Sequence, residues 1–531
     1  MSNPDSTQFQ PQAPPTTIDG IVRRLGPGLI VAGSIVGSGE LIATTKTGAE
    51  AGFYLLWLIL IGCVIKVYAQ VEFGRYSIVN GRTTMDGLAE VPGPGIKGRG
   101  NWLVWFWFLM FVASLGQLGG IVGGVGQALA ISAPLTRHGR EFNDHVDLWT
   151  QQRVKRAELE RAEQAGAGSE FSSQVARDLA DINVAFERSR RELIDKHGQD
   201  AFDDNGRPPA SPDEYIWAAI VTIVTCFILV NGRYGLIQSF STTMVALFTM
   251  VTVVNLLALQ ANPIWQVSVN DIVNGMSFRL PPVAEGGGSP LNTALKTFGI
   301  IGVGASELVT YPYWCLEKGY ARFTGPRDVS PDWAKRAAGW MRVMKWDAWC
   351  SMVVYTFATI AFYLLGAAIL GRTGLNPEKS DMIRTLAVMY EPVFGTWASI
   401  LFLFGAFAVL YSTFFVANAS HARVFSDVLR VLGMADDKHE TYRKRVRIFS
   451  GLFPVICLLM YMFFKSPAQL VLFSGFMQAL MLPMLAGAAL YFRYYRNDDR
   501  IPISKAWDLM LWLSAIGMLI TGVFLVKEAF Q

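Results

Sequence analysis

Charged residues are scarce in this sequence. Asp, Glu, Lys and Arg make up 17% of its 531 residues, whereas about a quarter is usual in a soluble globular domain. Apolar residues reach 52%, and they gather in long stretches, as they do in helices that cross a lipid bilayer. The net charge is only +4, which gives no reason to expect a nucleic-acid partner. The composition therefore predicts a membrane protein with several spans.

Motifs of soluble chemistry are also missing. The five cysteines lie in or beside apolar stretches without a C-x-x-C pair, so free thiols are expected rather than disulfides. No His/Cys cluster has the spacing of metal ligands. No G-x-x-x-x-G-K-[ST] motif is present, so an ATP-driven pump would need a separate subunit. We expect neither an enzyme nor a bound cofactor.

Eleven apolar segments are long enough to cross the hydrocarbon core, which takes roughly 20 residues in a helix. Helices are expected because lipid offers no hydrogen bonds to the backbone, and the alternation of barrel strands is absent. The segments are 26–48, 53–80, 102–132, 215–231, 237–260, 292–316, 346–371, 394–420, 447–464, 467–492 and 506–527.

The basic residues of the short loops predict the orientation. The loops 317–345 and 421–447 carry seven Lys or Arg each, and with eleven spans both lie on the side of Arg23 and Arg24. Cytoplasmic loops are the ones enriched in Lys and Arg. We therefore predict a multi-pass protein of the inner (cell) membrane, with a cytoplasmic N-terminus and an extracytoplasmic C-terminus.

A long polar insertion interrupts the apolar pattern. Its helical stretches, about 141–164 and 170–197, predict an antiparallel hairpin on the extracytoplasmic face. A spacer, a contact with another protomer or partner, and a lid are all open roles. The predicted domains are a disordered cytoplasmic tail at 1–20, the first three spans at 21–136, the hairpin insertion at 137–213 and the other eight spans at 214–531.

Two spans carry three small residues followed by a glutamate. Glu40 follows Gly37-Ser38-Gly39 in the first span, and Glu307 follows Gly304-Ala305-Ser306 in the sixth. Each span opens a set of five, the layout of inverted repeats whose paired broken helices form a site near the bilayer midplane. A carboxylate at that depth costs at least about 2.5 kcal/mol, which favours a functional role.

The substrate is therefore expected to bind between the first and sixth spans. A protonated packing role for the two glutamates, or a bond to a neighbouring group such as Lys46, is the alternative. The candidate substrate-binding residues are Gly37, Ser38, Glu40, Gly304, Ala305, Glu307, Thr310 and Gln478, with Glu40 and Glu307 as candidate metal ligands.

The membrane part resembles a known family. Gly26-Pro27-Gly28-Leu29-Ile30-Val31-Ala32, the stretch 70–82, Tyr411-Ser412-Thr413 and Leu482-Pro483 are similar to segments of the natural-resistance-associated macrophage protein (NRAMP) family of divalent-metal transporters. The resemblance excludes 1–20 and 137–213. It implies an all-α membrane fold of LeuT type, with eleven transmembrane helices in two inverted five-helix repeats plus one extra helix.

The site departs from the family's pattern. Gly37 stands where the family has a metal-binding Asp, and Glu40 stands where it has Asn. The family's Met-Pro-His falls on Leu308-Val309-Thr310, or on Tyr311-Pro312-Tyr313 after a slip of three residues, so the soft sulfur ligand is lost. Oxygen ligands suit a hard ion such as magnesium better than iron or manganese. The third span has no acid, so the family's proton route is not expected.

The resemblance implies secondary transport of a divalent cation by alternating access, with the lipid bilayer and the transported ion as the partners. A small organic solute is an alternative, because a cationic amine could pair with Glu40 or Glu307 and stack on Tyr311, Tyr313 or Trp314. A further alternative is a non-transporting sensor that signals through the 137–213 hairpin.

Overall fold

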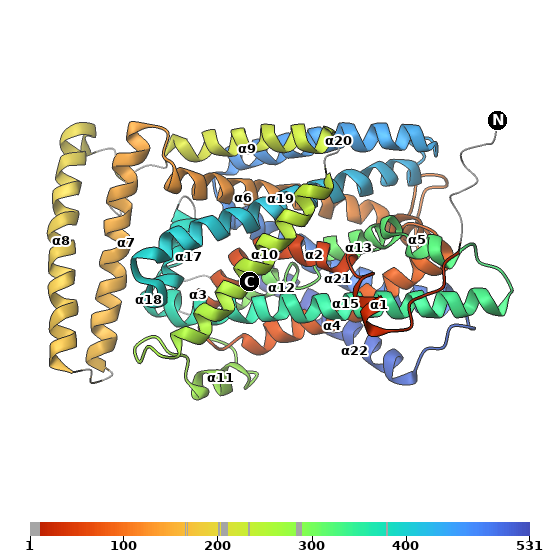
Figure 1. The fold of residues 1–531 in the computed structure, drawn as a ribbon, viewed down its shortest axis with the longest axis horizontal. Helices are drawn as coiled ribbons and strands as arrows, with labels where there is room; N and C mark the ends of the chain where they lie inside the picture. The colour runs from red at the N-terminus through yellow and green to blue at the C-terminus, as the bar shows by residue number, and fades with distance from the viewer. Residues whose placement is uncertain are drawn as a thin grey trace.

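The computed structural model describes residues 11–164, 166, 168–199, 202, 211–231, 234–282, 289–378 and 381–530. Within these ranges the regular elements are helices, and the only extended pairing is a single bridge between Gly95 and Asn101. Most long helices run along the longest axis of the molecule and form one bundle (Figure 1).

Nine helical segments of the described chain are long and apolar enough to cross a membrane. All nine overlap predicted spans. They are Pro27–Ala51 (α2 Pro27–Ile35, the π-helix η2 Val36–Thr44 and α3 Thr45–Ala51), α4 Leu56–Asn80, α6 Trp102–Ser132, α9 Pro212–Asn231, Pro331–Thr373 (α15 Pro331–Leu365, the π-helix η4 Gly366–Leu370 and α16 Gly371–Thr373), α19 Ala398–Val431, Glu440–Phe464 in α20 (His439–Phe464), α21 Pro467–Tyr495 and α22 Lys505–Ala529.

The two other predicted spans are helical but less regular. The fifth corresponds to α10 (Tyr234–Leu259), whose apolar part is the shorter Val245–Leu259. The sixth is divided into α12 (Pro290–Phe298) and α13 (Ala305–Lys318). The described chain thus contains nine candidate spans, judged by length and composition, and the total of eleven stays a prediction.

The two basic loops are shorter than the sequence predicted. The helix α15 begins at Pro331, inside the predicted loop 317–345, and α19 continues to Val431, inside 421–447. Lys and Arg are good helix formers, so these helices extend as polar ends beyond their apolar segments. The short helices α14 (Tyr320–Thr324) and α5 (Thr84–Glu90) lie at the same end of the bundle.

Residues 11–20 differ from the expected disordered tail, while 1–10 lie outside the described residues. The backbone N–H of Gln12 donates to the carbonyl of Phe323 (2.9 Å), and the indole of Trp340 donates to the carbonyl of Gln12 (3.0 Å). The helix α1 (Ile18–Val22) follows, with Thr17 as its N-cap. Hydrogen bonds to the backbone therefore order this segment, although its low content of apolar residues predicted disorder.

The two glutamate-bearing spans are interrupted in different ways. In the sixth span, residues 299–304 are not helical, and Gly302 has a φ of +55°, a conformation that favours glycine. The first span stays helical, but η2 is wound as a π-helix, so the expected unwinding at Gly37–Gly39 is wrong. π-Helical turns are often found at functional sites.

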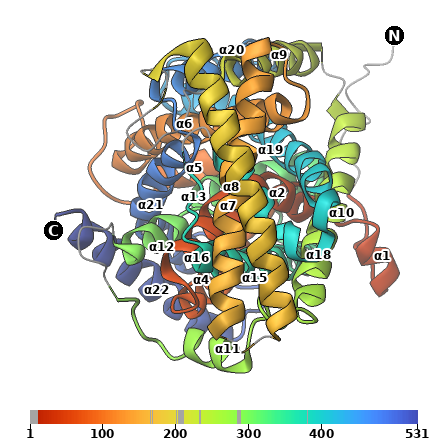
Figure 2. The ribbon, with the colours of Figure 1, turned by 90° about the vertical axis from the view of Figure 1, so that its left-hand side faces the viewer.

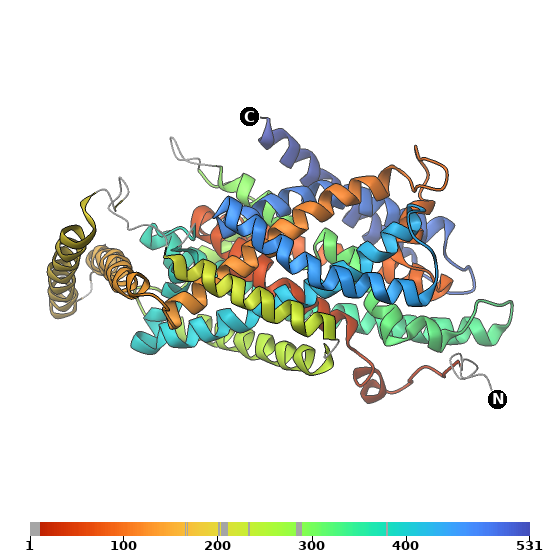
Figure 3. The ribbon, with the colours of Figure 1, turned by 90° about the horizontal axis from the view of Figure 1, so that it is seen from above.

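The insertion forms the predicted helical hairpin. The helices α7 (Arg137–Gln164) and α8 (Ser169–His197) lie side by side across one end of the bundle (Figures 1 and 2), and the N-terminus lies at the other end (Figure 3). The apolar positions of α8 face its partner, with Val175, Phe186 and Leu193 buried. The side of the membrane on which the hairpin lies stays a prediction.

Polar contacts of α7 dock the hairpin on the bundle. Arg384 of α17 (Met382–Ala387) donates to Asn143 Oδ1 (2.9 Å) and forms an ion pair with Asp147. Asn143 Nδ2 donates to the carbonyl of Ala130 at the end of α6 (3.0 Å). At the far end of α7, Arg161 donates to the carbonyl of Ile264 (3.0 Å).

We predict that Arg384→Ala loosens this docking, because it removes a hydrogen bond and an ion pair that together contribute roughly 1–3 kcal/mol. Hydrogen exchange measured by mass spectrometry should become faster in α7 peptides around Asn143 and Asp147. Arg188→Ala, at an exposed position of α8, is the control and should leave exchange there as in the wild type. Unchanged protection in Arg384→Ala would show that other contacts hold the hairpin.

Candidate functional site

Glu40 lies on η2 and faces the interruption of the sixth span. Its side chain is fully buried, and its Oε1 accepts hydrogen bonds from the Gly302 backbone N–H and from the Thr359 hydroxyl, both at 3.1 Å. Its Oε2 is buried without a hydrogen-bond partner among the described residues. A buried carboxylate oxygen without a donor is costly, so this atom is available to a ligand or carries a proton.

Close packing of the two interrupted spans positions Glu40. A Cβ on Gly39 would lie 2.8 Å from the carbonyl oxygen of Ile300, so only glycine fits at this crossing. The expected alternative bond from Glu40 to Lys46 is not formed. Lys46 instead forms ion pairs with Glu50 (2.8 Å) and Glu378 (2.7 Å) at the end of α3.

A buried lysine from α4 completes the same site. The side chain of Lys66 is 0% exposed, and its Nζ donates to the carbonyl of Phe298 (2.7 Å) and to the carbonyl of Ile301. Phe298 is the last residue of α12, where carbonyls have no partner within the helix and carry partial negative charge. The ammonium also interacts electrostatically with Glu40 and Glu307.

Glu307 lies in the first turn of α13, on the other side of the interruption. A carboxylate is stabilised there by the positive end of the helix dipole. Its Oε2 lies 2.5 Å from the position of a Cβ on Gly304, and the Oε1 of Gln478 lies 2.9 Å from that position. Because Gly304 has no side chain, it leaves room for both of these polar groups beside it. Glu307 is partly exposed, unlike Glu40.

A chain of side-chain amides joins the two interrupted spans. Gln478 of α21 accepts from the backbone N–H of Ser306 (3.0 Å) and donates to Gln117 Oε1 of α6 (2.7 Å). Gln117 in turn donates to the hydroxyl of Ser38 (2.7 Å), and Ser474 donates to Gln117 Oε1 (2.9 Å). Two candidates from the sequence, Ser38 and Gln478, are thereby brought together through Gln117.

The other three candidates are placed less directly. The N–H of Gly37 donates to Thr413 Oγ1 of α19 (3.2 Å), and a Cβ at this position would collide with that hydroxyl. Ala305 is the first residue of α13 and is fully buried. Thr310 donates to the carbonyl of Glu307 in its own helix (3.4 Å), so the structure gives it no contact with Glu40.

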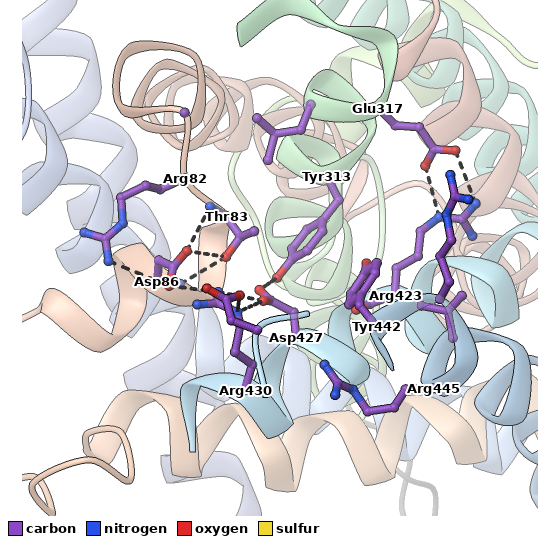
Figure 4. A pocket seen from close by; sticks show the side chains of 15 residues that line it. Arg82, Thr83, Asp86, Tyr313, Glu317, Arg423, Asp427, Arg430, Tyr442 and Arg445 are labelled. Atoms are coloured by element: carbon purple, nitrogen blue, oxygen red, sulfur yellow. Dashed lines mark hydrogen bonds and ion pairs between the residues drawn. The ribbon is translucent and has the colours of Figure 1, made fainter. Parts of the chain in front are cut away.

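A cavity of about 1040 Å³ opens beside the second half of α13, at the end of the bundle that carries α5. Figure 4 shows its charged lining, which comes from α5, α13, α19 and α20. It is lined by Gly81, Arg82, Thr83, Asp86, Tyr313, Leu316, Glu317, Arg423, Asp427, Arg430, Asp437, Tyr442, Arg443, Arg445 and Val446.

Ion pairs cross this cavity. Arg430 contacts Asp86 of α5 (2.9 Å) and Asp427 of its own helix (2.7 Å), and the Tyr313 hydroxyl donates to Asp427 Oδ2 (2.5 Å; Figure 4). Arg423 pairs with Glu317 at the end of α13 (3.0 Å). The second half of α13 is therefore held to α19, and α19 to α5, by interactions that a helix movement would break.

Sulfur lies beside the site, which the sequence did not indicate. Cys63 of α4 is fully buried, and its Cα lies 3.2 Å from the position of a Cβ on Gly302 in the interruption. Among the described residues no group of three or more His, Cys, Asp or Glu side chains could hold a metal ion. Any cation here would therefore depend on backbone, hydroxyl or amide oxygens besides the carboxylates.

Sequence reasoning missed several groups of this site. Lys66 had a detectable signal, since it is the one charged residue between Glu50 and Glu72, within an apolar stretch where charges are rarely without function. Thr359, Gln117 and Cys63 had none, because each is an ordinary residue of an apolar helix whose orientation depends on the packing.

Comparison with known proteins agrees with this architecture. A profile of the family described as "Natural resistance-associated macrophage protein-like" matches residues 210–528, more than half of the chain. The chain belongs to this family. NRAMP proteins are transporters, so this chain is a multi-pass membrane transporter of all-α, LeuT-type fold and not an enzyme. The segments 26–32 and 70–82 that carried the resemblance lie outside the matched range.

Solved structures show the same fold. A variant of the Eremococcus coleocola manganese transporter superposes with a TM-score of 0.57 at 14% identity, covering 98% of this chain and 90% of that one. The same transporter in complex with an aromatic bis-isothiourea substituted compound gives 0.56 at 14% identity, covering 99% and 91%. At this identity the likeness concerns the fold alone.

One relative has a closer sequence over a short stretch. An uncharacterized protein of Pasteurella multocida (strain Pm70) is 32% identical over 89 residues, which are 17% of this chain. The match spans only 18% of that protein's own length.

We predict that Gln117→Leu destabilises the NRAMP-type bundle. It removes the partner of the Ser38 hydroxyl and one of the two acceptors of Gln478 Nε2, and a buried polar group that loses its partner costs about 1–3 kcal/mol. Thermal unfolding in detergent should show a lower Tm. Gln260→Leu, at an exposed position at the end of α10, is the control, and an equal Tm for both variants would contradict a structural role of the amide chain.

Proposed function

We propose that the protein is a secondary transporter that moves a divalent metal cation across the inner membrane by alternating access. The single observation that carries the proposal is the unpartnered Oε2 of Glu40, buried beside the freed backbone groups of the sixth span. A cation satisfies such an oxygen, and helix interruptions commonly coordinate ions in this type of transporter. Family membership and the fold of a manganese transporter support a metal as the substrate.

Oxygen-rich surroundings favour a hard ion such as magnesium. The polar groups near the interruption are the carboxylates of Glu40 and Glu307, the Gln478 amide and backbone carbonyls. Magnesium is bound by a few carboxylates and keeps several waters, so it does not require a cage made entirely of protein atoms. The thiol of Cys63 is a soft donor on α4 next to the interruption.

In this proposal, alternating access involves structures at both ends of the bundle. The cavity beside α13 offers a route from the predicted cytoplasmic side, closed off by the Arg430 and Tyr313 interactions with Asp427. The hairpin α7–α8 crosses the opposite, predicted extracytoplasmic end (Figure 2). The interactions with Asp427 and the position of the hairpin would both have to change when the site opens to the other side of the membrane. A contact with another protomer is a further role that we propose for the hairpin.

The organic-cation alternative has less support. The Tyr311 hydroxyl donates to Asp347 (3.1 Å), the Tyr313 hydroxyl to Asp427, and the Trp314 ring packs under Arg423 at 5.1 Å. All three aromatic side chains are thus engaged away from Glu40. Membership of a transporter family disfavours the sensor alternative.

Transport assays test this proposal. In proteoliposomes, Glu40→Gln and Glu307→Gln should each lower magnesium uptake by about tenfold or more, because each removes one charge that offsets the cation. Glu378→Gln, which changes an exposed carboxylate that pairs with Lys46, should transport like the wild type. A wild type that binds no divalent ion at millimolar concentration would refute the metal, and normal uptake by both Gln variants would refute the site.

Selectivity provides a separate test. We predict that Cys63→Ser leaves magnesium binding within about twofold of the wild type, since a hard ion does not use the thiol. Cadmium binding to the same variant is measured by calorimetry and compared with magnesium binding. Cys226→Ser, which changes a half-buried cysteine on α9, is the matched control. A large loss of magnesium affinity in Cys63→Ser alone would mean that the thiol belongs to a softer metal site.

A further inference from the structure

Lys66 is unusual among the charged residues of α4. Glu72 and Arg75 pair with each other at 2.9 Å, whereas Lys66 has no carboxylate within ion-pair distance in the described chain. Its ammonium donates instead to two backbone carbonyls and lies 4.9 Å from the centroid of the Phe298 ring. A fully buried ammonium requires a compensating environment, and here the interrupted helix supplies it.

The carbonyls that bind Lys66 are those released by the interruption. Phe298 ends α12, and Ile301 lies within residues 299–304, which are not helical. Such carbonyls are the backbone groups that coordinate cations in broken membrane helices. The side chain of Lys66 thus fills, with its own positive charge, a position that suits a cation.

Building on the function proposed above, we propose that Lys66 is a tethered cation that competes with the transported ion. In the empty transporter its ammonium binds the carbonyls of Phe298 and Ile301 and offsets the charges of Glu40 and Glu307. The incoming cation takes over these interactions and displaces the ammonium. Lys66 is therefore a specificity-determining residue that weakens cation binding and stabilises the empty site.

The charges explain why both effects are expected. A carboxylate in a buried site is costly unless a cation lies near it. Lys66 attracts both Glu40 and Glu307. Its charge therefore allows the helices to stay packed around the site when no ion is bound. Without the Lys66 ammonium, the site would bind its ion more tightly. The empty transporter would, however, switch back less readily to the side from which it takes up the ion.

Two kinds of transport measurement separate these effects. Exchange of internal for external ion requires only the loaded transporter, whereas net uptake also requires the empty transporter to return. We expect Lys66→Met to bind magnesium about tenfold more tightly by calorimetry, since a competing charge has gone. Its exchange should persist, while its net uptake falls by about tenfold.

Lys46→Met is the matched control, because it also removes a buried ammonium, but one that pairs with Glu50 and Glu378 away from the interruption. It should keep the wild-type ratio of net uptake to exchange. Lys66→Gln, which is neutral but can still donate to a carbonyl, should behave as Lys66→Met and serves if the Met variant does not fold.

Unchanged or weaker magnesium binding in the neutral Lys66 variants would overturn the proposal, as would an unchanged ratio of net uptake to exchange. Loss of both kinds of transport in a folded variant would overturn it too, because Lys66 would then be needed by the loaded transporter. Manganese is measured in parallel as a second probe. If wild-type protein binds neither ion, the proposed function fails, which is a different result from failure of the Lys66 inference.

Discussion

Backbone groups released inside an apolar bundle must be satisfied without water, and the rest of the site follows from this constraint. The interruption at 299–304 frees the carbonyls of Phe298 and Ile301 and the N–H of Gly302. Lys66 and Glu40 satisfy them from the neighbouring helices α4 and η2. The tight crossing at Gly39 and the amide chain through Gln117 then keep the two interrupted spans in register.

Much of the fold could be predicted from the sequence, because long apolar segments in lipid leave few alternatives to helices. The repeated small-residue triplets predicted a helix break before each glutamate, and the structure has one before Glu307, at 299–304, but not before Glu40. The triplets could not distinguish the π-helical winding of η2 from a non-helical break, since glycine permits both. The ends of α15 and α19 were misplaced because Lys and Arg continue a helix beyond the membrane as readily as they occupy a loop.

The site was only partly predictable. Glu40 and Glu307 stood out as costly charges, whereas the contacts of Thr359, Gln117 and Cys63 depend on how α15, α6 and α4 are rotated in the bundle, which the sequence does not reveal. In the resulting site one ammonium partly offsets the charges of two carboxylates, and the helix ends of α12 and α13 favour the cation and the carboxylate that lie at them. Such a partial offset suits a transporter, which must both bind and release its ion.

The location of the transported ion is the central claim, and anomalous X-ray scattering from manganese-soaked crystals measures it most directly. The account predicts one strong peak beside the interruption, at roughly 2.0–2.6 Å from a carboxylate oxygen of Glu40 or Glu307, with the Lys66 ammonium displaced from the carbonyl of Phe298. A peak only in the charged cavity beside α13, or an occupied site with Lys66 still bound to that carbonyl, would contradict it.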